Sequence, residues 1–97
     1  MFAALATFVY LAELRNDRLE RNSARVRTGM SRTEAVAIMG LPSWDGACGT
    51  NGISLARDGC ASEIGYSSWL APVLPVYWVV ELDRRGRVIE AYILVSP

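Results

Sequence analysis

The sequence predicts one α+β domain, in which a long helix and a short helix precede three or four antiparallel strands. Three observations support this order. An uncharged apolar segment leads into a mixed-charge, helix-favouring segment over residues 1–27. Residues 29–42 carry start and stop signals for a short helix, and residues 76–95 contain two strand-like runs around a glycine turn. With 97 residues, the chain is long enough for one modest core.

Residues 1–12, MFAALATFVYLA, contain no charge and would be apolar around the whole circumference of a helix, whereas a surface helix shows an apolar stripe. A helix of this length spans about 18 Å, less than the ~30 Å hydrocarbon core of a bilayer. The segment also lacks the basic start and small-residue cleavage site of a signal peptide. Three interpretations remain: the end of a longer membrane anchor, a short complete anchor, or a helix buried in the core or in a dimer. We favour a membrane anchor.

The following segment, residues 13–27, is expected to continue the first helix in solvent, with sparse apolar contacts at Leu14, Leu19 and Val26. Its arginines alternate with acidic residues, which argues against a phosphate-binding site. The whole chain has ten basic and ten acidic residues and a formal net charge of zero. No global basic field therefore directs it to nucleic acid, and we expect no nucleic-acid partner.

The short helix has signals at both ends. Ser31 and Glu34 form the S-x-x-E pattern of a capping box, in which each side chain bonds the backbone N–H of the other residue. Gly40 is suited to a left-handed residue after the last turn, and Pro42 prevents the helix from resuming. This helix is expected to turn the chain from the first helix into the sheet.

The second half of the chain has the composition of a sheet. Short strands are expected at residues 44–48 and 63–69, and the clearest strand signal is VYWVVELD, then RRG, then RVIEAYILV, in the final hairpin. A type I turn at Arg84-Arg85 with Gly86 in the left-handed region would place Asp83 opposite Arg87.

Continuing that register would place Leu82 opposite Val88, Val80 opposite Glu90 and Trp78 opposite Tyr92. One sheet face would then hold Val76, Trp78, Val80, Leu82, Val88, Tyr92 and Leu94, and the other Tyr77, Val79, Ile89, Ala91, Ile93 and Val95. Both faces are apolar, so the face without helices needs the loop at residues 66–75, a second subunit or a partner. The candidates for partner binding are Tyr77, Val79, Ile89 and Ile93 on this face, and Trp69 and Leu70 in the loop.

Two segments carry a family resemblance. Residues 26–42, VRTGMSRTEAVAIMGLP, resemble the N-terminal signature of the SmpA/OmlA (BamE-like) outer-membrane assembly lipoproteins, with its Gly-Met pair, polar cap, short helix and closing Gly-x-Pro. The segment VYWVVELDRRGRVIEAY is similar to the final hairpin of that family. The resemblance implies that residues 13–97 form one BamE/BLIP-like α+β domain, with two helices packed on one face of a small three- to four-stranded antiparallel sheet.

The same resemblance implies a non-enzymatic role at the bacterial envelope, as an accessory in assembly or as a binding module. The lipoproteins of the family carry a lipobox Cys after the apolar segment, whereas the first Cys here is Cys48. We therefore expect a divergent relative without a lipobox, held at the inner membrane by residues 1–12 and facing the periplasm.

Candidates for chemistry are few. Cys48 and Cys60 are the only thiols, and the chain has no His, so no zinc site can be completed and no metal is expected. In an exported domain they are expected to form a structural disulfide; reduced thiols are the alternative, and a catalytic redox pair is a third. Asp45 and Asp58 are explained by Asp-Gly turns, and Ser67 and Ser68 lack a base. We expect neither an enzyme nor a cofactor.

The sequence therefore favours an envelope-associated binding domain that acts through a protein partner or through self-association. One rival is a soluble cytosolic homodimer whose apolar N-terminal helix forms the dimer core. A less favoured rival is a thiol-redox protein that uses Cys48 and Cys60.

Overall fold

The computed structural model describes residues 2–49, 55, 58–69 and 76–95. Helix α1 (Phe2–Ser23) and helix α2 (Arg32–Met39) precede four strands: β1 (Trp44–Ala47), β2 (Ser62–Ser67), β3 (Val76–Leu82) and β4 (Val88–Val95). All three neighbouring pairs are antiparallel, and the sheet order is β1-β2-β3-β4. The predicted α+β class is confirmed, with the helices N-terminal to the strands.

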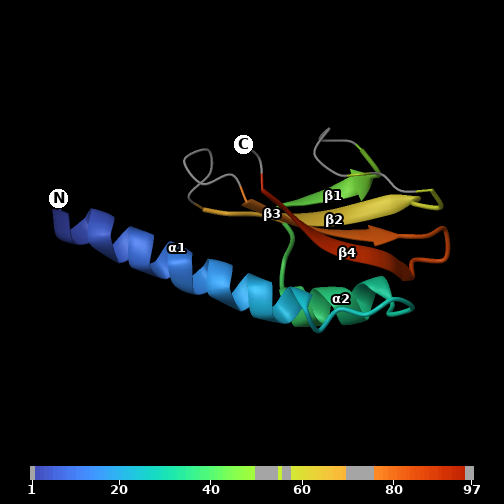
Figure 1. Cartoon of the computed structure of the whole chain (residues 1–97), viewed down its shortest axis with the longest axis horizontal. Coiled ribbons are helices and arrows are strands. Elements are labelled where there is room, and N and C mark those ends of the chain that lie inside the picture. Colours follow the sequence, from blue (N-terminus) through green and yellow to red (C-terminus); the bar gives the residue numbers. More distant parts are fainter. Residues whose placement is uncertain (1, 50–54, 56–57, 70–75, 96–97) are drawn as a thin grey trace.

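Both helices lie on the same side of the sheet, and the N-terminal part of α1 extends beyond the sheet (Figure 1). Apolar side chains from α1, α2 and the facing side of β2, β3 and β4 form a single core. The buried members of this core are Leu19, Val26, Ala35, Met39, Ile64, Tyr66, Trp78, Val80, Leu82 and Val88. We call the opposite side of the sheet, which carries no helix, the outer face.

The final hairpin confirms the predicted turn and corrects the predicted register. Gly86 has a φ of 76°, and its N–H donates to the carbonyl oxygen of Asp83 at 3.0 Å. The N–H of Asp83 donates to the carbonyl oxygen of Arg87 at 2.9 Å, and Leu82 opposes Val88, as expected. The next pairs are Glu81 with Glu90 and Val80 with Ala91, because a bulge leaves Ile89 as an extra residue in β4.

This bulge exchanges the two faces of β4 beyond Val88. Trp78 opposes Ile93 and Val76 opposes Val95, so these four residues share the helix-covered side, since paired residues of neighbouring strands point to the same face. On the outer face Tyr77 opposes Leu94 and Val79 opposes Tyr92. The prediction that placed Ala91, Ile93 and Val95 with Tyr77 and Val79, and Tyr92 and Leu94 with Trp78, is therefore wrong.

Helix α2 begins as its local sequence predicts and ends at the predicted glycine, although the conformation of that glycine differs from the prediction. The hydroxyl of Ser31 accepts from the N–H of Glu34 at 3.1 Å, and the carboxylate of Glu34 accepts from the N–H of Ser31 at 3.2 Å. Hydrogen bonding of the carboxylate by Ser31, chiefly through its backbone N–H, lowers the pKa of Glu34, since it favours the charged form. Gly40 has a φ of 94°, in the region that favours glycine, but its ψ of -169° makes it extended rather than left-handed helical.

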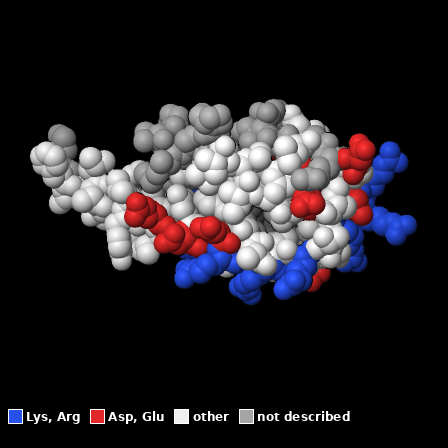
Figure 2. Space-filling model, in the orientation of Figure 1, with Lys and Arg blue, Asp and Glu red and all other residues white. Residues whose placement is uncertain are grey.

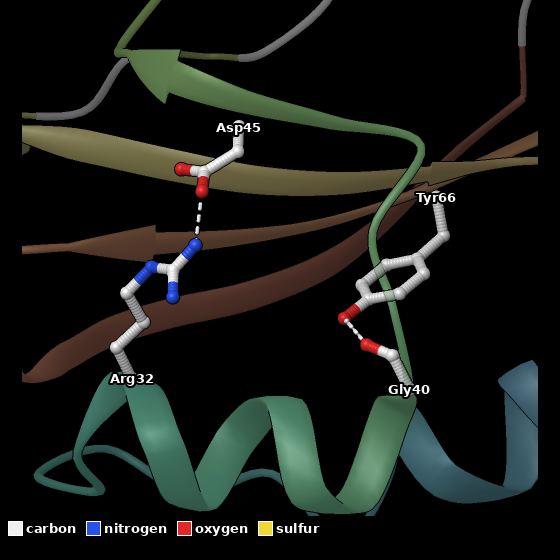
Figure 3. A network of polar contacts seen from close by, with 4 residues as sticks. All are labelled: Arg32, Gly40, Asp45 and Tyr66. Atoms are coloured by element: carbon white, nitrogen blue, oxygen red, sulfur yellow. Dashed lines mark hydrogen bonds and ion pairs between the residues drawn. The ribbon is translucent and has the colours of Figure 1, made fainter.

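Two polar contacts fix α2 against the sheet (Figure 3). Arg32, at the start of the helix, forms an ion pair with Asp45 of the edge strand β1. Tyr66 of β2 donates its hydroxyl proton to the carbonyl oxygen of Gly40 at 2.7 Å. Since the Tyr66 ring is fully buried, this bond satisfies a polar atom that would otherwise be costly inside the core.

Candidate binding surfaces

The outer face carries a row of three glutamates across the sheet. Glu63 of β2 opposes Glu81 of β3, which opposes Glu90 of β4. Glu63 and Glu81 are both 0% exposed. A buried carboxylate must be hydrogen-bonded, so the partners of these groups decide whether the row is a structural feature or a site.

Hydrogen-bond donors are directed at the two buried carboxylates. Glu63 accepts from the indole Nε1 of Trp44 at 2.8 Å and from the N–H of Gly49. Glu81 accepts from the hydroxyl of Tyr92, which in turn accepts from the N–H of Leu55 at 2.7 Å. The row thus helps to hold Gly49 and Leu55, which follow β1 in the chain, at the outer face. Among the described residues, no group of three or more His, Cys, Asp or Glu is arranged to hold a metal ion.

The predicted partner-binding residues do not form one surface. Tyr77 and Val79 lie on the outer face. Tyr77 packs edge-on against Trp44, with ring centroids 6.2 Å apart, and Val79 is only 1% exposed. Ile93 is 42% exposed but belongs to the opposite side of β4. Ile89 is the partly buried residue of the bulge, and Leu70 lies outside the described residues.

Among the predicted candidates, Trp69 lies in an exposed apolar setting. The residue is 51% exposed and lies beside α1. Phe8 stacks on it with ring centroids 6.3 Å apart, and the guanidinium of Arg15 lies 4.9 Å from its ring centroid. Arg15 also donates to the carbonyl oxygen of Ser67 at 2.8 Å, and the side-chain amide of Asn16 donates to the hydroxyl of Ser68 at 3.0 Å. These bonds join the middle of α1 to the end of β2.

The N-terminal half of α1 is exposed on all sides. We call residues 2–11 the apolar arm, since every residue in it is exposed and none is charged. Its large apolar side chains are Phe2, Leu5, Phe8, Val9, Tyr10 and Leu11. Ala12 is the first buried residue, so burial in the core of one chain is excluded for the arm. No helix in the described part of the chain combines the length and apolar composition needed to cross a bilayer.

A groove follows the apolar arm along α1. It has a volume of about 410 Å³, and we call it the arginine groove; its lining residues are Leu11, Leu14, Arg15, Arg18, Arg21 and Trp69. None of the acidic residues of α1 lines it. Figure 2 shows the uncharged arm at one end of the molecule and both signs of charge gathered over the rest of α1.

Sequence reasoning missed this groove because it judged the arginines by their acidic neighbours in the chain. Arg15, Arg18 and Arg21 recur every third residue, a spacing that places side chains on adjoining parts of one helix surface. Glu13, Asp17 and Glu20 follow a separate stripe at spacings of four and three. The regular arginine spacing directly after an apolar segment was the available signal.

The predicted disulfide is present between Cys48, just after β1, and Cys60, just before β2, with their Cα atoms 6.1 Å apart. It closes the connection between the two strands at the end where Gly49 bonds Glu63. The described part of the chain contains no free cysteine.

Geometry and fold class thus define a small disulfide-bonded α+β domain with an exposed apolar helical arm. Comparison with family models, with curated proteins and with solved structures gives no match to this chain.

Proposed function

We propose that this chain is a non-enzymatic binding domain of the bacterial envelope, attached to the membrane surface by its apolar arm and facing the periplasm. The proposal follows the resemblance of residues 26–42 and of the final hairpin to the BamE-like family. Its partner in the envelope is a protein or a second copy of the chain.

The observation that carries the proposal is the exposure of the apolar arm. Phe2 is 90% exposed, Leu5 61% and Tyr10 62%, on a helix whose first charged residue is Glu13. A contiguous apolar surface of this kind normally marks an interaction site with a membrane or another protein. Burying these side chains in lipid gains about 25 cal/mol for each Å² removed from water.

The disulfide supports the assignment to an exported compartment. Disulfides persist in oxidising compartments such as the bacterial periplasm and are rare in the cytosol. The Cys48–Cys60 bond lies within the folded part of the chain, so this part is the one expected on the oxidising side.

The same exposed arm also favours a second candidate, a homodimer in which two arms cover each other in solution. A third candidate, a thiol-redox protein, rests on the Cys48–Cys60 pair alone. The pair lacks the C-x-x-C spacing of many redox sites, and neither helix that the structure describes begins at a cysteine, where it could stabilise a thiolate.

The test compares vesicle co-sedimentation of the full chain with that of the variant Leu5→Glu/Val9→Glu. Both residues are exposed, so the variant should fold normally while losing membrane binding. The matched control is Leu41→Glu/Val95→Glu, which changes two exposed apolar residues outside the arm and should bind as the original chain does.

Sedimentation velocity without lipid separates the membrane from the dimer. A monomer that binds vesicles supports the proposal. A stable dimer that Leu5→Glu/Val9→Glu dissociates, without vesicle binding, would replace it with the homodimer. For the redox candidate, Cys48→Ser/Cys60→Ser would have to lose activity in cells while the fold remains intact.

A further inference from the structure

The arginine groove brings three positively charged side chains together. The ion pair found among the described residues, Arg32 with Asp45, lies outside the groove. In the same part of the chain, no acidic side chain forms an ion pair with Arg15, Arg18 or Arg21. Burial, with a smaller contribution from the neighbouring charge of Arg18, lowers the pKa of Arg15. An anion in the groove would offset both effects, because it supplies opposite charge beside a partly desolvated cation.

The groove is held in place before any ligand binds. Arg15 donates to the carbonyl oxygen of Ser67 and lies over the ring of Trp69, while Phe8 stacks on the same residue. Arg15 keeps further N–H donors beyond the one used, since a guanidinium has five. Arg18 and Arg21 are exposed and bring two more guanidinium groups to the same groove. One guanidinium group can donate two parallel hydrogen bonds to two oxygens of the same phosphate, so several arginines can bind one phosphate group.

The surroundings of the groove distinguish a lipid phosphate from a free one. Leu11 and Leu14 line the groove together with the arginines, and the apolar arm continues directly from it. Trp69 adds an aromatic ring with a polar N–H, a residue type enriched at the interface between membrane and water. A phosphate bound here would therefore lie at the edge of an apolar surface that can accept acyl chains.

The length of the arm matches this arrangement. Leu5 precedes Arg15 by ten residues. At 1.5 Å per residue this places Leu5 about 15 Å from Arg15 along the helix axis, which is half of a ~30 Å hydrocarbon core. With Arg15 at the level of the phosphates, the arm would reach through one leaflet.

We propose that the arginine groove binds the phosphate of an anionic phospholipid, whose acyl chains lie along the apolar arm inserted in the same leaflet. This inference rests on the proposed membrane attachment and adds its lipid class and the depth of insertion. An anionic lipid is favoured over a zwitterionic one. Three arginines exceed the negative charge of one phosphate, and only a headgroup with a net negative charge can offset this excess of positive charge.

The experiment measures binding of the full chain to vesicles of phosphatidylcholine alone and of phosphatidylcholine mixed with phosphatidylserine. The test variant is Arg18→Gln/Arg21→Gln, and the matched control is Arg84→Gln/Arg85→Gln, which removes two exposed arginines at the far turn between β3 and β4. Each groove arginine should contribute about fivefold to binding of the anionic vesicles, so the test variant should lose about 25-fold. The control should lose less than about threefold, since its charges lie away from the membrane surface.

Each outcome decides between the proposals. A loss confined to the test variant and to anionic vesicles supports the groove. Equal losses in both variants would show binding through general charge and overturn it. Binding of inorganic phosphate without vesicles that Arg18→Gln/Arg21→Gln abolishes, with no preference for anionic vesicles, would overturn it in favour of a free-phosphate site. Equal binding of both vesicle types by all chains would overturn the groove alone, whereas no binding to either vesicle would overturn the proposed membrane attachment as well.

Discussion

The indole ring of Trp44 lies directly on Gly65 of the neighbouring strand, so close that a Cβ atom at Gly65 would be 2.0 Å from Cζ2 of the ring. The two residues are paired across β1 and β2 on the outer face. With the ring in this position, Nε1 of Trp44 donates to the buried carboxylate of Glu63 at 2.8 Å. Glycine is therefore required at residue 65 to hold the edge strand and to satisfy a buried acid.

Gly65→Ala should destabilise the domain by roughly 2–4 kcal/mol, from overpacking and from loss of a hydrogen bond to a buried carboxylate. Urea unfolding measures the cost. In a Trp44→Ala background the same Gly65→Ala change should be neutral or slightly stabilising, since the ring is gone and Ala is better suited to a strand than Gly. An equal loss in both backgrounds would contradict the steric explanation.

The corrected faces of β4 give a second prediction, for Val79 and Ile93. Val79→Lys should destabilise by roughly 3–5 kcal/mol, because its side chain is 1% exposed and a longer, charged side chain would have to be buried there. Ile93→Lys should cost about 1 kcal/mol or less, since Ile93 is 42% exposed. Thermal unfolding of the two single variants checks this, and similar losses would show that both residues belong to one buried face.

Val79 and Ile93 also show which features of the fold could not be predicted from the sequence. The N-terminal cap of α2 and the glycine turn at Asp83–Gly86 depend on neighbours within a few residues, so their local sequence was sufficient to predict them. The bulge at Ile89 depends on how a whole strand pairs with β3, and a shift of one residue exchanges the faces of everything after it. A regular hairpin pattern could not reveal this shift.

The arginine groove was hidden for a related reason. Arg15, Arg18 and Arg21 are mixed with acids in the chain but separated from them around the helix, and Trp69 joins them from a point almost fifty residues later. The row of glutamates likewise needs the long-range pairing of β2, β3 and β4. Local structure was thus predictable, whereas surfaces assembled from several elements were not.

Tyr66 gives a prediction about alkaline pH. Burial, opposed by Arg32 and aided by Asp45, raises the pKa of Tyr66 from 10.0 to about 12. The unfolded chain therefore loses this proton at lower pH than the folded chain, so the contribution of Tyr66 is complete below pH 10 and is lost as the pH rises towards 12. Tyr66→Phe should make the fall in unfolding free energy over this range less steep.

The same variant should cost about 1 kcal/mol at neutral pH, because the bond to the carbonyl oxygen of Gly40 is lost. Tyr10→Phe is the matched control, since Tyr10 is 62% exposed on the apolar arm. Removal of its hydroxyl should leave the free energy of unfolding at neutral pH unchanged. An unaltered slope at alkaline pH in Tyr66→Phe would rule out Tyr66 as its source.

The last prediction concerns the Cys48–Cys60 disulfide, which joins the edge strand β1 to β2 across a sequence separation of 12. Reduction should lower the free energy of unfolding by about 3 kcal/mol, since closing a loop of this size restricts the unfolded chain. The loss should be felt first in β1, which is four residues long and pairs only with β2 in the described sheet. Urea unfolding with and without reductant measures the total loss of unfolding free energy, and hydrogen exchange should be faster in β1 than in β3.

The variant Cys48→Ser/Cys60→Ser is the control for the effect of the reductant. Its free energy of unfolding should equal that of the reduced chain and should not change when reductant is added. Two free thiols in the chain isolated from native cells, detected by mass spectrometry without reduction, would contradict both the disulfide and the compartment inferred from it.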